Sequence, residues 1–117
     1  PDFQVLDLGL SHICVNIIKN ALDSMQSGGA IEIKTTIAQD RAVISFSDTG
    51  SGMPPSVVEK IFEPFFTTKS QDKGTGLGLA ICREIVNRYD GAINVQSIVG
   101  KGSTFIVTIP SKFLKNV

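Results

Sequence analysis

The sequence predicts an α+β protein, a two-layer sandwich in which helices pack on one face of a mixed, largely antiparallel sheet. Two segments repeat apolar residues at spacings of three and four, which is typical of helices with one buried face. Each is followed by two strand-like segments, so the order is helix, strand, strand, long loop, helix, strand, strand. That alternation of helices and hairpins favours helices gathered on one side of the sheet. With 117 residues, of which 42% are hydrophobic, we expect one domain over residues 1–117.

The first half of the chain contains one predicted helix and one predicted hairpin. The helix covers residues 10–25 and ends at Ser27-Gly28-Gly29; its expected buried stripe is Leu10, Ile13, Cys14, Ile17, Ile18, Ala21, Leu22 and Met25. Residues 30–38 alternate as a strand covered on one side should, with Ile31, Ile33, Thr35 and Ile37 on the covered face. A turn over residues 39–41 leads into a second strand over residues 43–48, which completes an antiparallel hairpin.

The second half begins with a long loop over residues 49–76, which includes a short helix over residues 55–62. A connection of this length in a small domain is usually functional. Helical spacing returns over residues 77–89 and ends at Asp90-Gly91. Strands over residues 92–98 and 103–109, joined by a glycine turn, complete the predicted sheet.

Charge and cysteine content exclude several classes of function. Lys plus Arg and Asp plus Glu number 11 each, so no basic field is available for a nucleic-acid backbone or an anionic membrane. No apolar run approaches the roughly 20 residues of a membrane span. Cys14 and Cys82 lack metal-site spacing and are interpreted as small buried hydrophobic residues in a reducing compartment. We therefore expect a cytoplasmic segment of a longer protein, since the chain starts at Pro1 rather than at methionine.

The first candidate site is a polar ridge on the first helix. His12, Asn16 and Asn20 are spaced by four and share one helix face. Amide oxygens in line suit Mg²⁺, which keeps several waters and is shared with phosphate oxygens. The alternative is a merely solvated helix face, because asparagine is common on exposed surfaces.

Two glycine-rich segments are the next candidates. Asp48-Thr49-Gly50-Ser51-Gly52 directly follows a strand, so its carboxylate could accept a hydrogen bond from an exocyclic amine such as that of adenine. By itself this segment also fits an ordinary turn. The run from Gly74 to Leu79 leads into a helix, where free backbone amides and the helix dipole favour phosphate. It fits neither the dinucleotide-binding fingerprint nor the Walker loop.

The long loop has an unusual aromatic content. Phe62, Phe65 and Phe66 lie in an otherwise polar segment, which fits a lid over residues 53–76 that docks when a ligand binds. Lys69 and Lys73 could then reach phosphates. The alternative is a loop pinned permanently by an aromatic cluster.

Taken together and in this order, these motifs resemble the catalytic, ATP-binding domain of bacterial sensor histidine kinases over about residues 7–109. The segment Thr67-Thr68-Lys69 is most similar to the nitrogen-regulation type. The resemblance implies the Bergerat fold, with ATP and Mg²⁺ as ligands. It implies that Asn20 binds Mg²⁺, Asn16 lines the phosphate site, and Asp48 binds the adenine amine.

The resemblance also implies roles for the remaining motif residues. Gly50 and Gly52 would shape the adenine pocket, and Thr104 would support the base through water. Phe62, Phe65 and Phe66 would anchor the lid, and Phe62, Thr68 and Lys69 would take part in binding the nucleotide. Those that would hold the phosphates are Gly74, Thr75, Gly76, Leu77, Gly78 and Leu79.

Asn16 distinguishes a kinase from a hydrolase. Hydrolysing members of this superfamily carry a glutamate there, and an amide cannot act as a general base. We therefore predict transfer of the γ-phosphoryl group to a histidine, with Asn16, Asn20 and Lys69 as catalytic residues that act by positioning and charge stabilisation. His12 lacks the acidic neighbour of an acceptor motif, so the acceptor is expected on a dimerising helical hairpin outside this chain, and a response regulator is the expected downstream partner. An ATP-driven conformational machine and a nucleotide-binding module without turnover are the alternatives.

Overall fold

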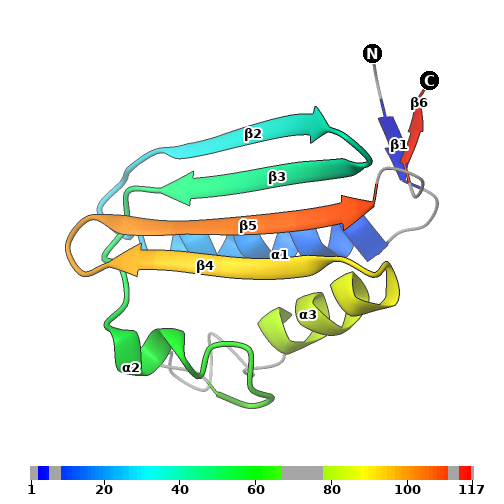
Figure 1. Cartoon of the computed structure of the whole chain (residues 1–117). Coiled ribbons are helices and arrows are strands. Elements are labelled where there is room, and N and C mark those ends of the chain that lie inside the picture. The colour runs from blue at the N-terminus through cyan, green and yellow to red at the C-terminus, as the bar shows by residue number, and fades with distance from the viewer. Residues whose placement is uncertain (1–2, 6–8, 67–77, 111–113, 117) are drawn as a thin grey trace.

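The computed structural model describes residues 3–5, 9–66, 78–110 and 114–116. The order of elements in the chain is β1 (Phe3–Val5), α1 (Gly9–Asp23), β2 (Ile31–Ala38), β3 (Arg41–Asp48), α2 (Pro55–Val58), α3 (Gly78–Arg88), β4 (Ala92–Ile98), β5 (Gly102–Pro110) and β6 (Leu114–Asn116). Strands β2 to β5 form one sheet, with α1 and α3 packed behind it (Figure 1). The predicted α+β architecture is confirmed.

The sheet has the strand order β2-β3-β5-β4, and each of its pairings is antiparallel. Both predicted hairpins are present, β2 with β3 and β4 with β5. Strand β5 then pairs with β3, so residues far apart in the chain become neighbours in the sheet: Phe105 lies opposite Phe46 on one side and Val95 on the other. This pairing aligns the end of β3 with the start of β5, where the predicted adenine motif lies.

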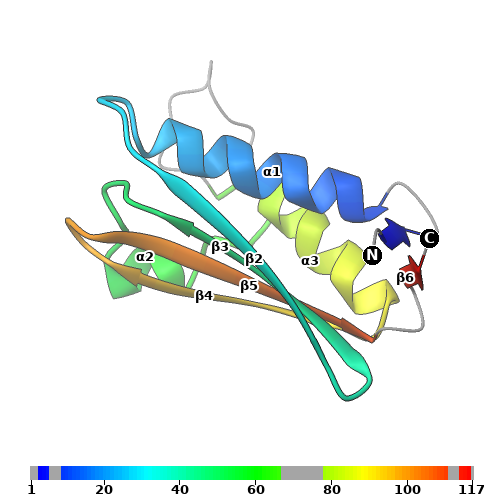
Figure 2. The ribbon, with the colours of Figure 1, turned by 90° about the horizontal axis from the view of Figure 1, so that it is seen from above.

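Helices α1 and α3 cover one face of the sheet (Figure 2). Alternate residues of β3 and β5 point toward the helices and are buried, while their neighbours face the other side. The buried core consists of Leu10, Ile13, Ile17, Ile44, Phe46, Ile61, Cys82, Val86, Tyr89, Phe105, Val107 and Ile109. Both cysteines are free, and Cys82 is fully buried as predicted.

Strand β2 is less covered than its sequence predicts. Ile33 and Ile37, expected on a buried face, are 49% and 44% exposed. The helices contact β3, β4 and β5, and β2 forms an edge of the sheet that extends away from α1 (Figure 2). Leu22, expected in the buried stripe of α1, is 58% exposed. Both predictions of burial were wrong.

Smaller differences concern the ends of the chain and the long loop. The sequence did not predict the short β1–β6 pair, which brings the two ends together. The helix expected over residues 55–62 is regular only over Pro55–Val58 and continues as turns. Within the described part of the chain, no helix is both long enough and apolar enough to span a membrane.

Candidate functional site

A row of three polar side chains crosses the helix-facing side of the sheet at one end. Asp48 of β3, Ser103 of β5 and Ser97 of β4 are direct neighbours in the antiparallel register. The adjacent row on the same face is apolar, with Phe46, Phe105 and Val95 in the corresponding positions. Asp48 and Ser103 are only 9% and 8% exposed. Buried polar side chains need hydrogen-bond partners, so this row is a candidate binding site.

The Asp48 carboxylate is held by the backbone around it. Its Oδ1 atom accepts hydrogen bonds from the backbone N–H of Gly50, at 2.9 Å, and of Ser103, at 3.3 Å. Both contacts follow from the fold, since the chain turns sharply after β3 and β5 starts directly opposite. Among the described residues, hydrogen bonds to this carboxylate reach only Oδ1, and Oδ2 is left as an acceptor. A fixed, charged acceptor of this kind can bind an amino group.

The loop after Asp48 is clamped on two sides. Ser51 donates its N–H to the carbonyl of Ser24 at the end of α1, at 3.1 Å, and accepts from the N–H of Gly100 in the β4–β5 turn, at 2.7 Å. Met53 donates its N–H to Ser97 Oγ, also at 2.7 Å. Gly50 passes so close to Ser24 that a Cβ atom on it would lie 2.1 Å from the serine Oγ. Small residues at positions 50 and 52 therefore allow the loop to lie between α1 and the hairpin.

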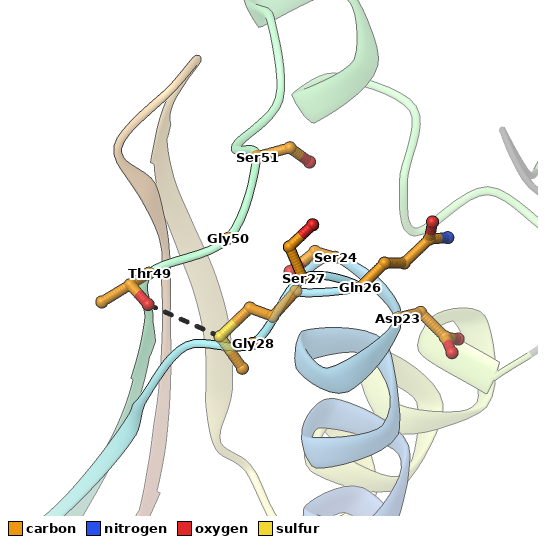
Figure 3. Close-up of a pocket in the computed structure, with 9 residues that line it drawn as sticks. Asp23, Ser24, Gln26, Ser27, Gly28, Thr49, Gly50 and Ser51 are labelled. Carbon is orange, nitrogen blue, oxygen red and sulfur yellow. Dashed lines mark hydrogen bonds between the residues drawn. The ribbon is translucent and has the colours of Figure 1, made fainter.

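A cavity of about 460 Å³ opens on the flank of this loop (Figure 3). Its walls come from the last residue of α1 and the segment after it, residues 23–28, and from residues 49–51. The Thr49 hydroxyl accepts from the N–H of Ala30 at 3.0 Å and contacts the Met25 sulfur at 3.6 Å. The lining is mostly polar, and three of its residues, Thr49, Gly50 and Ser51, belong to the predicted adenine motif, so the cavity borders that segment.

The predicted asparagine ridge lies on α1 beside the start of α3. Asn16 donates from Nδ2 to the carbonyl of His12 at 3.0 Å, which turns its carbonyl oxygen away from its own helix. A Cβ atom placed on Gly78 would lie 2.9 Å from that oxygen, so the amide borders the N-terminus of α3. Asn20 lies one turn further along α1 and is half-buried, whereas His12 is exposed. The structure thus brings Asn16 and Gly78, both predicted phosphate-site residues, into proximity.

The amide oxygens on α1 fit a Mg²⁺ ion that also binds water and phosphate. No cluster of three or more His, Cys, Asp or Glu side chains suited to a metal occurs among the described residues, so a metal held entirely by such groups is not found there. The amide oxygens of Asn16 and Asn20 are hard ligands on one helix face. Mg²⁺ commonly binds through one or two protein oxygens, with water and substrate phosphates completing its octahedron. The residues present are therefore compatible with Mg²⁺ that arrives with a phosphate ligand.

The predicted lid lies partly outside the described residues. Thr68, Lys69, Lys73, Gly74, Thr75, Gly76 and Leu77 all lie in residues 67–77, of which the structure gives no description.

Within the described part of the lid, Phe62 packs edge-on against Phe105, with ring centroids 6.5 Å apart, and the Arg83 guanidinium lies 5.8 Å from its ring centre. Phe66 and Leu79 are partly buried against the core. Phe65, expected to anchor the lid, is instead 73% exposed with φ of 67°.

The structure places Thr104 on the opposite side of the sheet from Asp48. Its hydroxyl lies 3.0 Å from the Ser47 hydroxyl, and the two residues are cross-strand neighbours. The neighbour of Asp48 on the helix-facing side is Ser103 and not Thr104, the residue that the resemblance implied would support the base. The signal for Ser103 was present in the sequence: Phe105 is a core residue, and the two-residue period of a strand puts residue 103 on the same face. Ser97 was missed because only the pairing of β4 with β5 reveals it.

Comparison with known proteins agrees with this geometry. The profile of the family described as histidine kinase-, DNA gyrase B- and HSP90-like ATPase matches residues 6–112. The chain is 45% identical over 103 residues to sporulation kinase C of Bacillus subtilis, covering 88% of this chain and 24% of the relative. It is 42% identical over 120 residues to sensor kinase CckA of Brucella abortus, covering 89% of this chain and 13% of the relative. The chain therefore spans about a quarter or less of the length of these relatives.

Solved structures show the same likeness. The catalytic domain of histidine kinase ThkA, in a nucleotide-free form, superimposes with a TM-score of 0.76 at 36% identity, over 87% of this chain and 66% of that one. A mycobacterial sensor histidine kinase, MprB, gives a TM-score of 0.80 at 28% identity, over 92% of this chain and 77% of that one. Full-length ShkA, solved in complex with AMPPNP, gives 0.75 at 31% identity, over 87% of this chain and 21% of that one.

Proposed function

Because the chain belongs to the histidine kinase-, DNA gyrase B- and HSP90-like ATPase family and matches the catalytic domains of sensor histidine kinases, we propose that it binds Mg²⁺-ATP and transfers the γ-phosphoryl group to a protein histidine. The acceptor histidine belongs to a dimerising helical hairpin of the same parent protein, and a response regulator receives the phosphoryl group from it. Residues 1–117 form one catalytic domain in the cytoplasm. The assignment to the nitrogen-regulation type stays a prediction.

The observation that carries this proposal is the buried carboxylate of Asp48. Two backbone N–H groups hold Oδ1, and Oδ2 remains as an acceptor at the end of the sheet. Adenine offers an exocyclic amine that matches this acceptor. The neighbouring loop is clamped between α1 and the β4–β5 turn, so the acceptor is fixed before a ligand arrives. The complex of ShkA with AMPPNP, an ATP analogue, supports the same class of ligand here.

Asn16 supports transfer to a histidine over hydrolysis. Its amide borders the first residue of α3, where the helix N-terminus and the preceding glycine run would hold phosphates. At that place an amide can orient a phosphate or a metal-bound water, but it cannot take a proton from water. The chain therefore lacks, at this position, the base that a hydrolase needs.

The proposed catalytic contribution is mainly positioning and charge stabilisation. Asn20 would hold Mg²⁺, which when bound neutralises charge on the β- and γ-phosphates, and Asn16 would line the phosphate site. The N–H groups at the start of α3 stabilise the phosphate oxygens. Lys69 and Thr68, with the glycine run before Gly78, are proposed to complete the phosphate site.

The first test is calorimetric titration of the chain with ATP, with and without Mg²⁺. We expect Mg²⁺-dependent binding that weakens at least tenfold in Asp48→Asn, because a hydrogen bond to a charged group contributes about 1.5–3 kcal/mol. Asp40→Asn, the same change in the exposed β2–β3 turn, is the matched control and should bind like the wild type. Asn20→Asp should alter the Mg²⁺ dependence more than the binding of ATP alone.

A second measurement separates the kinase from its alternatives. Phosphate release is followed in the same samples, and the histidine-bearing hairpin of the parent protein is then added together with [γ-³²P]ATP. Label on the hairpin with little free phosphate supports the proposal. Rapid hydrolysis by the wild-type chain would indicate an ATP-driven conformational machine, and binding without either product would indicate a nucleotide-binding module.

A further inference from the structure

Ser97 stands at the centre of a hydrogen-bond network that no motif in the sequence marks. Its Oγ lies 2.7 Å from the Met53 N–H, 3.2 Å from the Gly102 carbonyl and 2.8 Å from the Ser103 hydroxyl. These partners come from the loop after Asp48 and from the start of β5, the strand beside Asp48. One half-buried hydroxyl on β4 therefore connects its own strand with the two segments next to Asp48.

The protons of this network can be assigned by counting donors. A serine hydroxyl has one proton and two lone pairs. Met53 donates its N–H to Ser97, and the carbonyl of Gly102 can only accept, so we assign the single proton of Ser97 to Gly102. Either hydroxyl can be the donor in the contact between Ser97 and Ser103, and with this assignment the contact uses the proton of Ser103. Ser97 thereby makes all three of its hydrogen bonds, and Ser103 keeps only lone pairs for other partners.

The consequence falls beside the carboxylate. Ser103 and Asp48 are cross-strand neighbours, and the Ser103 N–H already donates to Asp48 Oδ1. With its hydroxyl proton directed toward Ser97, Ser103 offers only acceptors, as the carboxylate does. The side chains of Asp48 and Ser103 therefore both accept hydrogen bonds here, and neither has a proton left to donate.

We propose that Ser97 is a positioning residue for base recognition: it holds the Ser103 hydroxyl as an acceptor beside Asp48, so that the site favours a base with an amino group over one with a carbonyl at the same position. This inference rests on the proposed function, because it concerns selection among nucleoside triphosphates at that site. The Ser97 hydroxyl also accepts from the Met53 N–H, and so holds the loop after Asp48 in place at Met53.

The test compares ATP with inosine triphosphate, which carries a carbonyl in place of the 6-amino group. In Ser97→Ala the Ser103 hydroxyl is free to rotate and donate, so we expect the preference for ATP over inosine triphosphate to fall about fivefold, the contribution of one hydrogen bond. Ser97→Thr keeps the hydroxyl and should restore the preference. Ser47→Ala is the matched control, because it removes a similar hydroxyl pair from the opposite face of the sheet.

The outcomes separate the two proposals. If Ser97→Ala weakens both nucleotides equally and the ratio stays unchanged, Ser97 only stabilises the fold and the inference is wrong. The inference is also wrong if Ser97→Ala changes the ratio no more than Ser47→Ala does. If the wild-type chain binds ATP but none of these effects follows, the proposed function survives alone; if it binds no ATP, both fail. Urea unfolding of each variant confirms that the titrated protein is folded.

Discussion

Gly52, in the loop after Asp48, packs against the backbone of the β4–β5 hairpin. Replacing it with alanine should lower the free energy of unfolding more than most glycine substitutions do. Its φ of +71° lies in the left-handed region, which costs an alanine about 1–2 kcal/mol. A Cβ atom there would lie 2.0 Å from the Ile98 carbonyl oxygen, and atoms do not approach so closely. Because this obstacle is backbone, the loop and the hairpin must move apart by about 1.4 Å to restore an ordinary contact of 3.4 Å.

That movement acts on two hydrogen bonds of 2.7 Å, from Gly100 N–H to the Ser51 carbonyl and from Met53 N–H to Ser97 Oγ. At about 1 kcal/mol each, their loss adds to the backbone strain and gives about 3–4 kcal/mol for Gly52→Ala. Gly100→Ala is the matched control: its φ is +82°, but a Cβ atom would meet nothing within 4 Å. It should lose about 1–2 kcal/mol, from backbone strain alone.

The free energy of unfolding of each variant is measured by urea titration. Tyr89 is the only tyrosine, the chain has no tryptophan, and Tyr89 is buried, so its fluorescence reports loss of the core. The m-value should stay unchanged if both variants unfold from the same compact state. Equal destabilisation by Gly52→Ala and Gly100→Ala would refute the reasoning, because it would mean that the predicted contact with Ile98 has no cost.

Other positions make equally specific predictions. Phe105→Ala removes a ring that is 1% exposed and should lower the free energy of unfolding by about 3–5 kcal/mol. Arg83→Ala loses only an exposed contact with the Phe62 ring and should lower it by no more than about 1 kcal/mol. Urea titration measures both changes. Burial raises the pKa of the Cys82 thiol from its ordinary 9.0 to about 11. The folded state therefore holds this proton more tightly than the unfolded state, and stability should decline as the pH rises from about 9 to about 11, an effect that Cys82→Ala removes. Alkylation of Cys82 at neutral pH should accordingly be slow in the native protein and fast in urea, as mass spectrometry can show.

Local patterns in the sequence were sufficient for most of the fold. The spacing of apolar residues located α1 and α3, and alternation located both hairpins, because each of these elements buries one face and so repeats with its own period. The motifs around Asn16, Asp48 and Gly78 also predicted a candidate site, and the structure brings Asn16 and Gly78 close together. These features depend on residues close together in the chain, which is why one sequence was enough to find them.

Pairings between distant segments determined the rest. Strand β5 lies beside β3, and this places Ser103 rather than Thr104 next to Asp48 and brings Ser97 into the same row. Ile33, on the edge strand β2, and Leu22, on α1, are exposed, although their spacing in the sequence is that of buried residues. A periodic pattern tells which residues share a face, but what covers that face depends on which elements pack together. The pairing of β5 with both β3 and β4 is what brings the carboxylate of Asp48 and the hydroxyls of Ser103 and Ser97 into one row.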